Sequence, residues 1–184
     1  MTQHEYMFVA ISIVLGLALT RLLGQVGGLI RAHRRINFHW ATAVWAFCIL
    51  IFILQMWWAG WELRDFQDWT IVDFFFLVAG TVFVYGAAEL ALPVEDYDVA
   101  SDKELDFLSH SQSLGRISAA SMLAYFAVGP YFNIRLLGND PLYSVMLAGV
   151  GALLMLWVVL RPNNFSVISI VFALYAALVL YLTA

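Results

Sequence analysis

The chain has 184 residues, of which 63% are hydrophobic and only 12% are charged. Soluble domains contain about 45 to 50% apolar and about 25% charged residues, so this composition and a mean hydropathy of +0.84 predict an integral membrane protein surrounded by the lipid bilayer. The net charge of −4, with one short basic tract at residues 31–35, excludes nucleic acid as a partner on electrostatic grounds.

Apolar runs of membrane length occupy nearly the whole chain and leave no room for a separate soluble domain of the usual size. Residues 1–184 are therefore expected to form a single transmembrane domain. We predict an all-α integral membrane protein, a compact bundle of six transmembrane helices, because about 20 apolar residues suffice for each crossing. The predicted spans are 7–30, 40–61, 70–93, 116–137, 142–160 and 165–182.

The first span carries Arg21 near its middle. As a helix, this span is about 36 Å long, whereas the hydrocarbon core of a bilayer is about 30 Å thick. An arginine at the centre of a span costs about 2.5 to 3.5 kcal/mol on insertion scales, so it usually faces protein or a wet cavity and has a partner. We therefore expect Arg21 to be buried and paired with an acidic residue of another span.

A row of small residues recurs at every fourth position of the first span: Gly16, Thr20, Gly24 and Gly28. Residues four apart lie on one face of a helix, and small side chains allow another backbone to approach closely. This row predicts a packing face. The packed helix belongs either to the same chain or to a second subunit, which would make the protein a homo-oligomer.

The connection between the first two spans contains Arg31, Arg34 and Arg35, and short basic loops stay in the cytoplasm. The second span ends in a tryptophan cluster of the kind found at membrane interfaces, formed by Trp57, Trp58 and Trp61. Six spans then return the chain to the side on which it started. We predict a multi-pass protein of the cell membrane with both termini extracytoplasmic.

The only long polar stretch, residues 94–115, is acidic and too polar to cross the membrane. Ser101 followed by Glu104 fits a capping box, and Leu105, Leu108 and Leu114 give a thin apolar face. We predict a short amphipathic surface helix between the third and fourth spans, and a protein partner that docks on this loop. Within the fourth span, Pro130 predicts a kink.

Glu89 in the third span is the expected partner of Arg21, because both residues fall in the inner half of the bilayer. Thr81 and Tyr85 precede Glu89 at four-residue steps, and Gln25 lies one turn beyond Arg21, so these side chains predict one polar face. The pair then either fixes the packing of the two spans or forms part of a path for protons or ions. The sequence does not separate these two interpretations.

Other polar groups are weaker candidates. Asp73 near the start of the third span, with Glu62, Asp65 and Asp68 just before it, forms either an acidic mouth or, more simply, a solvated loop. A metal site of His33, His39, His110 and Asp106 is conceivable on one side of the membrane, but no paired-ligand spacing within one helix supports it. We therefore predict no metal site.

No Gly-rich phosphate loop, nucleophile elbow or catalytic triad pattern occurs in the sequence, so we expect neither an enzyme nor a cofactor. The favoured expectation is an oligomeric channel or carrier for protons, ions or a small solute that uses the Arg21 and Glu89 pair. The alternative is a non-catalytic structural or regulatory membrane subunit whose acidic cytoplasmic loop docks a partner.

Overall fold

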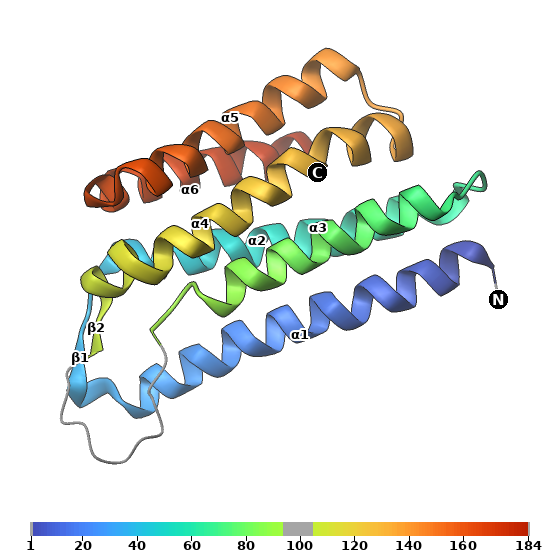
Figure 1. Ribbon diagram of the computed structural model, residues 1–184. Coiled ribbons are helices and arrows are strands. Elements are labelled where there is room, and N and C mark those ends of the chain that lie inside the picture. The colour runs from blue at the N-terminus through green and yellow to red at the C-terminus, as the bar shows by residue number, and fades with distance from the viewer. Residues whose placement is uncertain (1, 94–104, 184) are drawn as a thin grey trace.

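Six long helices make up most of the computed structural model, which describes residues 2–93 and 105–183 (Figure 1). All six are long and apolar enough to cross a membrane. The expected all-helical bundle is therefore confirmed, and its composition fits a multi-pass membrane protein. The helices are α1 (Gln3–Arg31), α2 (Trp40–Glu62), α3 (Ile71–Glu89), α4 (Phe107–Tyr131), α5 (Pro141–Leu160) and α6 (Phe165–Thr183).

Short elements connect the helices. Three single turns of 3₁₀-helix, η1 (His33–Arg35), η2 (Leu63–Asp65) and η4 (Pro162–Asn164), follow α1, α2 and α5. Two short strands, β1 (Ile36–Asn37) and β2 (Leu105–Asp106), pair in parallel and join the start of α2 to the start of α4. Strands of two residues are too short to show a strand periodicity, so this pairing has no signal in the sequence.

Side-chain caps define where several helices begin. Thr2 and Glu5 form a capping box on α1, and Thr70 and Asp73 form one on α3. Asp140 accepts a hydrogen bond from the Tyr143 N–H at the start of α5. Each cap provides a partner for backbone N–H groups that the first helical turn leaves without one, which matters most where water is scarce.

The helix α4 begins well before the predicted fourth span. Asp106 caps it by accepting from the Leu108 N–H at 3.0 Å, and the helix continues without a break through Gly115 and Arg116. The predicted surface helix is therefore not a separate element over residues 107–115, which form the first turns of α4. The expected capping pair, Ser101 and Glu104, lies outside the described residues, as does the acidic loop around it.

Near its other end, α4 contains Pro130, which has no N–H to donate to the Phe126 carbonyl. The chain then changes to a π-helical segment, η3 (Phe132–Leu136), in which the Leu137 N–H bonds to the Phe132 carbonyl at 3.2 Å. The kink at Pro130 stays a prediction. The structure adds that the helix changes type immediately after this proline.

The helices form two layers. In Figure 1, α1, α3, α4 and α5 lie side by side in one layer, and contacts link each of them to the next. The second layer contains α2 and α6, which pack on each other, and α2 also contacts α1, α3 and α4. The helix α4 is thus central in its layer, with α3 on one side and α5 on the other.

Two glycines bring the neighbours of α4 close to it. A Cβ atom on Gly86 of α3 would lie 2.6 Å from the Ser121 hydroxyl oxygen, and one on Gly151 of α5 would lie 2.8 Å from the Phe126 ring. Both distances are shorter than any normal contact. A larger residue at either position would therefore force the two helices apart.

Trp45 of α2 lies at the centre of the core and is 0% exposed. Its indole N–H donates to the Ser118 hydroxyl of α4 at 3.0 Å, and that hydroxyl donates to the Ala87 carbonyl of α3 at 2.9 Å. The indole ring also packs against Phe165 and Phe172 of α6, with centroid distances of 5.1 and 4.9 Å. One buried residue thus connects four helices.

We predict that Ser118→Ala destabilises the protein, because it leaves the buried Trp45 N–H without an acceptor at a cost of about 1 to 3 kcal/mol. Thermal unfolding of the purified protein, followed by circular dichroism, measures the change. Ser113→Ala is the matched control, since the exposed Ser113 hydroxyl bonds only to carbonyls of its own helix. Equal unfolding temperatures for the two variants would contradict the assigned role of Ser118.

Candidate functional site

The bundle has two ends of different chemistry. At the end that we call the N-terminal end, His4 of α1 lies 2.9 Å from the Gly60 carbonyl of α2, and the α2–α3 and α4–α5 connections lie at the same end (Figure 1). At the opposite end, which we call the basic end, α1 finishes at Arg31 and α5 at Leu160, just before Arg161. The polar clusters and the cavities divide between these two ends.

Arg21 and Glu89 meet between α1 and α3. The Arg21 Nε and Nη2 atoms donate to the two Glu89 carboxylate oxygens, each at 2.6 Å, in a two-pronged ion pair. Glu89 is the last residue of α3. The pair therefore joins the end of α3 to the side of α1. Two parallel hydrogen bonds to one carboxylate require the planar guanidinium of arginine, which lysine cannot replace.

The expected burial of this pair is wrong. The Arg21 side chain is 58% exposed and that of Glu89 is 28% exposed, so the pair lies on the side of the bundle. Arg21 falls away from the buried face of α1, which is formed by Ile11, Leu15, Ala18, Leu22 and Gln25. The four-helix layer ends at α1, and none of the described helices covers the Arg21 guanidinium.

Gln25 joins the pair, whereas Thr81 does not. The Gln25 Nε2 donates to the Glu89 carbonyl at 2.6 Å, while its buried Oε1 has no hydrogen-bond partner among the described residues. Tyr85 lies near the Arg21 guanidinium. The Thr81 hydroxyl donates to the Val78 carbonyl of its own helix at 2.8 Å, so the polar face predicted along α3 does not extend to it.

Among the described residues, no other helix packs against the row of small residues on α1. A Cβ atom added to Gly16 or Gly24 would meet no atom within 4 Å, and Thr20 is exposed with its hydroxyl bonded to the Gly16 carbonyl. At Gly28 the nearest atom belongs to Arg31 of the same helix. The expectation that another helix of this chain covers the row is therefore wrong, while contact with a second subunit stays a prediction.

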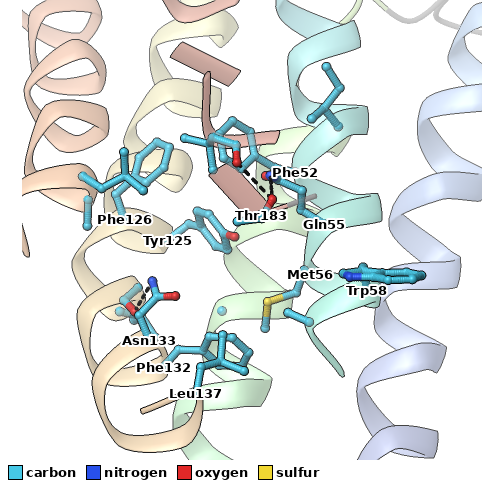
Figure 2. Close-up of a pocket in the computed structure, with 18 of the residues that line it drawn as sticks. Phe52, Gln55, Met56, Trp58, Tyr125, Phe126, Phe132, Asn133, Leu137 and Thr183 are labelled. Carbon is cyan, nitrogen blue, oxygen red and sulfur yellow. Dashed lines mark hydrogen bonds between the residues drawn. The ribbon is translucent and has the colours of Figure 1, made fainter. Parts of the chain in front are cut away.

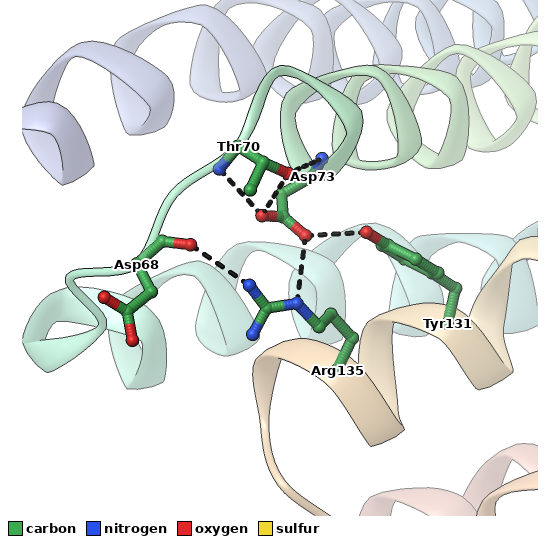
Figure 3. Close-up of polar contacts among 5 residues, drawn as sticks. All are labelled: Asp68, Thr70, Asp73, Tyr131 and Arg135. Carbon is green, nitrogen blue, oxygen red and sulfur yellow. Dashed lines mark hydrogen bonds and ion pairs between the residues drawn. The ribbon is translucent and has the colours of Figure 1, made fainter.

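Asp73 is the centre of a polar cluster at the N-terminal end (Figure 3). Its carboxylate is 0% exposed and accepts hydrogen bonds from the Thr70 hydroxyl and the Tyr131 hydroxyl, both at 2.7 Å. The Arg135 Nε lies 3.8 Å away, and the same guanidinium donates to the Asp68 carbonyl at 3.1 Å. The cluster fastens the π-helical segment after α4 to the start of α3.

The interpretation of Asp73 as part of a solvated loop is thus wrong. Its partners Tyr131 and Arg135 lie about sixty residues further along the chain, so no local spacing announces them. Asp65 and Glu62, by contrast, are exposed, and Asp65 forms an exposed ion pair with Arg64. The one signal in the sequence is Arg135 itself, a charge close to the end of the fourth predicted span that calls for an acidic partner.

A cavity of about 550 Å³ lies between the two layers toward the N-terminal end (Figure 2). Volumes of about 300 to 1,000 Å³ are typical of sites for small molecules. Five helices contribute to its walls, which consist mostly of aromatic and aliphatic side chains. Lining residues include Phe52 and Met56 of α2, Phe76 of α3, Phe126 of α4, Leu147 of α5 and Val179 of α6.

A few polar atoms face this cavity. The Gln55 Nε2 donates to the Thr183 hydroxyl at 3.1 Å, and the Asn133 amide donates to the Gly129 carbonyl at 3.2 Å. Figure 2 shows the Tyr125 hydroxyl directed toward the space beside Met56 and Thr183. Among the residues that the structure describes, no group accepts or donates a hydrogen bond to that hydroxyl, so it is available to a bound molecule.

A second cavity of about 520 Å³ lies at the basic end between α1 and α2. Apart from His33, its lining is entirely apolar, and it includes Leu22, Val26, Ala46, Phe47 and Phe107. Neither cavity has Arg21 or Glu89 in its wall. The ion pair and the two cavities are therefore separate features of the bundle.

The histidines considered as metal ligands have other partners. His39 caps α2 by accepting from the Ala41 N–H, and His110 lies 3.1 Å from the Leu90 carbonyl. His33 lies 3.2 Å from the Ile30 carbonyl of the preceding turn. Over residues 2–93 and 105–183, no three histidine, cysteine or acidic side chains come together in a group that could hold a metal ion.

No family model, no curated protein and no solved structure matches this chain.

We predict that Glu89→Gln and Arg21→Gln each lower the thermal stability, because each leaves one charge at membrane depth without its partner. The double variant should recover much of the loss. Unfolding temperatures of the wild type, both single variants and the double variant in lipid nanodiscs measure this coupling. Purely additive losses would show that the two side chains do not stabilise each other.

Proposed function

We propose that the protein is a small membrane carrier whose solute-binding site is the cavity between α2, α3, α4, α5 and α6. The cavity itself carries the proposal, because it combines the size of a small-molecule site with walls from five helices. Its apolar lining suits a hydrophobic or amphipathic solute rather than a hydrated ion. We infer from the basic residues at the opposite end that this cavity lies in the outer half of the cell membrane.

The exposed edge of the cavity supports entry from the surrounding bilayer. Leu54, Trp58 and Leu180 line the cavity and are 50%, 60% and 47% exposed. The opening thus lies on the side of the bundle, where α2 and α6 meet the lipid. A solute dissolved in the membrane reaches such a site without crossing an aqueous phase.

The position of the ion pair argues against the proton or ion path expected from the sequence. A path needs polar groups or water along its length, but Arg21 and Glu89 lie outside both cavities and on the side of the bundle. Between Glu89 and the first cavity, α3 passes Thr81 and then Gly80, which lines the cavity. The Thr81 hydroxyl donates to the Val78 carbonyl of the same helix and so offers no hydrogen bond to a passing ion. We therefore assign the solute to the cavity.

We predict that Gly80→Leu abolishes binding of a hydrophobic probe, because the new leucine side chain fills part of the cavity. A Cβ atom at this position would meet only the flexible end of the Met56 side chain, so the leucine can be accommodated. Bromododecanol, which quenches tryptophan fluorescence on contact, serves as the probe in nanodiscs, and Trp58 lines the site. Gly149→Leu on α5 is the matched control, since it points into open space. Saturable quenching that persists in Gly80→Leu would overturn the proposal.

A second candidate function, that of a structural or regulatory membrane subunit, is favoured by the uncovered face of α1. This face combines the row Gly16, Thr20 and Gly24 with the exposed ion pair of Arg21. Small residues permit close helix contact, and a charge pair at membrane depth is better covered by protein than by lipid. We propose that a second copy of the chain packs on this face and forms a homo-oligomer.

We predict that Gly24→Leu reduces the size of the assembly while leaving the fold of the single chain intact, because none of the described residues beyond the local backbone of α1 lies within 4 Å of the new Cβ. Light scattering coupled to size-exclusion chromatography gives the mass, and circular dichroism reports the helical content. Gly149→Leu again provides the control. An unchanged mass for Gly24→Leu would show that this face takes no part in assembly.

A further inference from the structure

We propose that the solute of the cavity is a single-chain amphiphile with a cationic ammonium head group. This inference rests on the proposed function and specifies the chemical class of molecule that the same site binds. Two properties of the cavity carry it: the elongated distribution of its apolar walls and the charge at its mouth.

The cavity is long in the direction of the helices. Its lining residues on α2 run from Ile51 to Glu62, which corresponds to about 16 Å along the helix axis. The inner part is enclosed by aromatic rings, among them Phe52 and Phe126, whose centroids are 5.3 Å apart in an edge-on contact. A volume of about 550 Å³ distributed over this length accommodates one extended hydrocarbon chain.

We use the word mouth for the part of the opening beside Trp58 and Glu62, where α2 ends. This mouth carries a single charged side chain. Glu62, at the end of α2, is the one lining residue with a formal charge at neutral pH. One of its carboxylate oxygens accepts from the Trp58 indole N–H at 3.1 Å, which holds the carboxylate beside the indole ring. A carboxylate next to an exposed aromatic ring is the combination that binds an ammonium group, through charge and through the face of the ring.

The nearest arginines do not reverse this charge. Arg64 pairs with Asp65 and lies over the Trp61 ring, while Arg135 lies beside Asp73 and over the Phe66 ring. Neither arginine lines the cavity. An anionic head group would therefore be repelled by the Glu62 carboxylate, and no cationic side chain lines the cavity to offset that repulsion.

The polar atoms within the cavity are compatible with a hydrocarbon chain. Gln55, Thr183 and Asn133 line the cavity, and Figure 2 shows the Tyr125 hydroxyl close to Gln55 and Thr183. Gln55 and Thr183 are bonded to each other, so they present little unsatisfied polarity to a hydrocarbon chain that passes them. The head group thus remains at the mouth and the chain extends inward between α2, α4 and α6.

The test compares three brominated probes with the same alkyl chain in nanodiscs of neutral phosphatidylcholine: bromododecyltrimethylammonium, bromododecanol and bromododecanoate. Tryptophan quenching gives the affinity of each, corrected for its partition into empty nanodiscs. We expect the ammonium probe to bind about tenfold more tightly than the alcohol, and the carboxylate probe more weakly than both. Glu62→Gln should abolish the preference for ammonium while the alcohol still binds.

Asp65→Asn is the matched control, because it removes a neighbouring carboxylate that does not line the cavity, and it should keep the preference. Equal binding of the ammonium and alcohol probes to the wild type would overturn the inference but leave the proposed function standing. The inference fails likewise if Asp65→Asn and Glu62→Gln lose the preference equally. If no probe binds saturably, the proposed function and the inference fail together.

Discussion

The hydrogen-bonded chain from Trp45 through Ser118 to Ala87 is the constraint on which the rest of the bundle depends. In a hydrocarbon medium no water replaces a missing partner, so a buried indole N–H fixes the position of whatever accepts from it. Here the acceptor is the Ser118 hydroxyl of α4, which in turn donates a hydrogen bond to the Ala87 carbonyl of α3. The three helices are thereby held in one relative register, and the rings of α6 pack around the same indole. The two cavities lie apart from this central contact, since neither Trp45 nor Ser118 lines them.

The uncovered face of α1 and the cavity of about 550 Å³ involve different residues, so the proposed assembly and the proposed solute binding would depend on different parts of the sequence. No residue of α1 lines the cavity of about 550 Å³. Its polar lining residues Gln55, Tyr125 and Thr183 lie on α2, α4 and α6. A protein arranged in this way can be covered on one side by another subunit while the opening between α2 and α6 stays in contact with lipid. On the α1 side, the Gln25 Oε1 beside the ion pair has no hydrogen-bond partner among the described residues.

The number of spans and the meeting of Arg21 with Glu89 followed from the sequence, because hydrophobic length and the depth of a charge along a span are local properties. The direction in which Arg21 faces did not follow, since it depends on the order of helices within the layer. The partners of Asp73 were equally hidden: Tyr131 and Arg135 reach it only because α3 and α4 are neighbours. Residues 107–115 belong to α4 and not to a separate surface helix, because polar residues at the start of a helix do not interrupt its backbone hydrogen bonds. The cavity has no local signature at all, since five helices contribute to it.

The π-helical segment Phe132–Leu136 has a geometric consequence of its own. A π turn holds one residue more than an α turn, and each residue of an α-helix advances the side-chain direction by about 100°. Loss of a single residue from this segment would therefore turn every following side chain around the axis. Arg135 would leave Asp73 and Phe66, and in the same step Leu137 would leave the cavity wall. A deletion that costs little in a loop would here change an ion pair and a binding site at once.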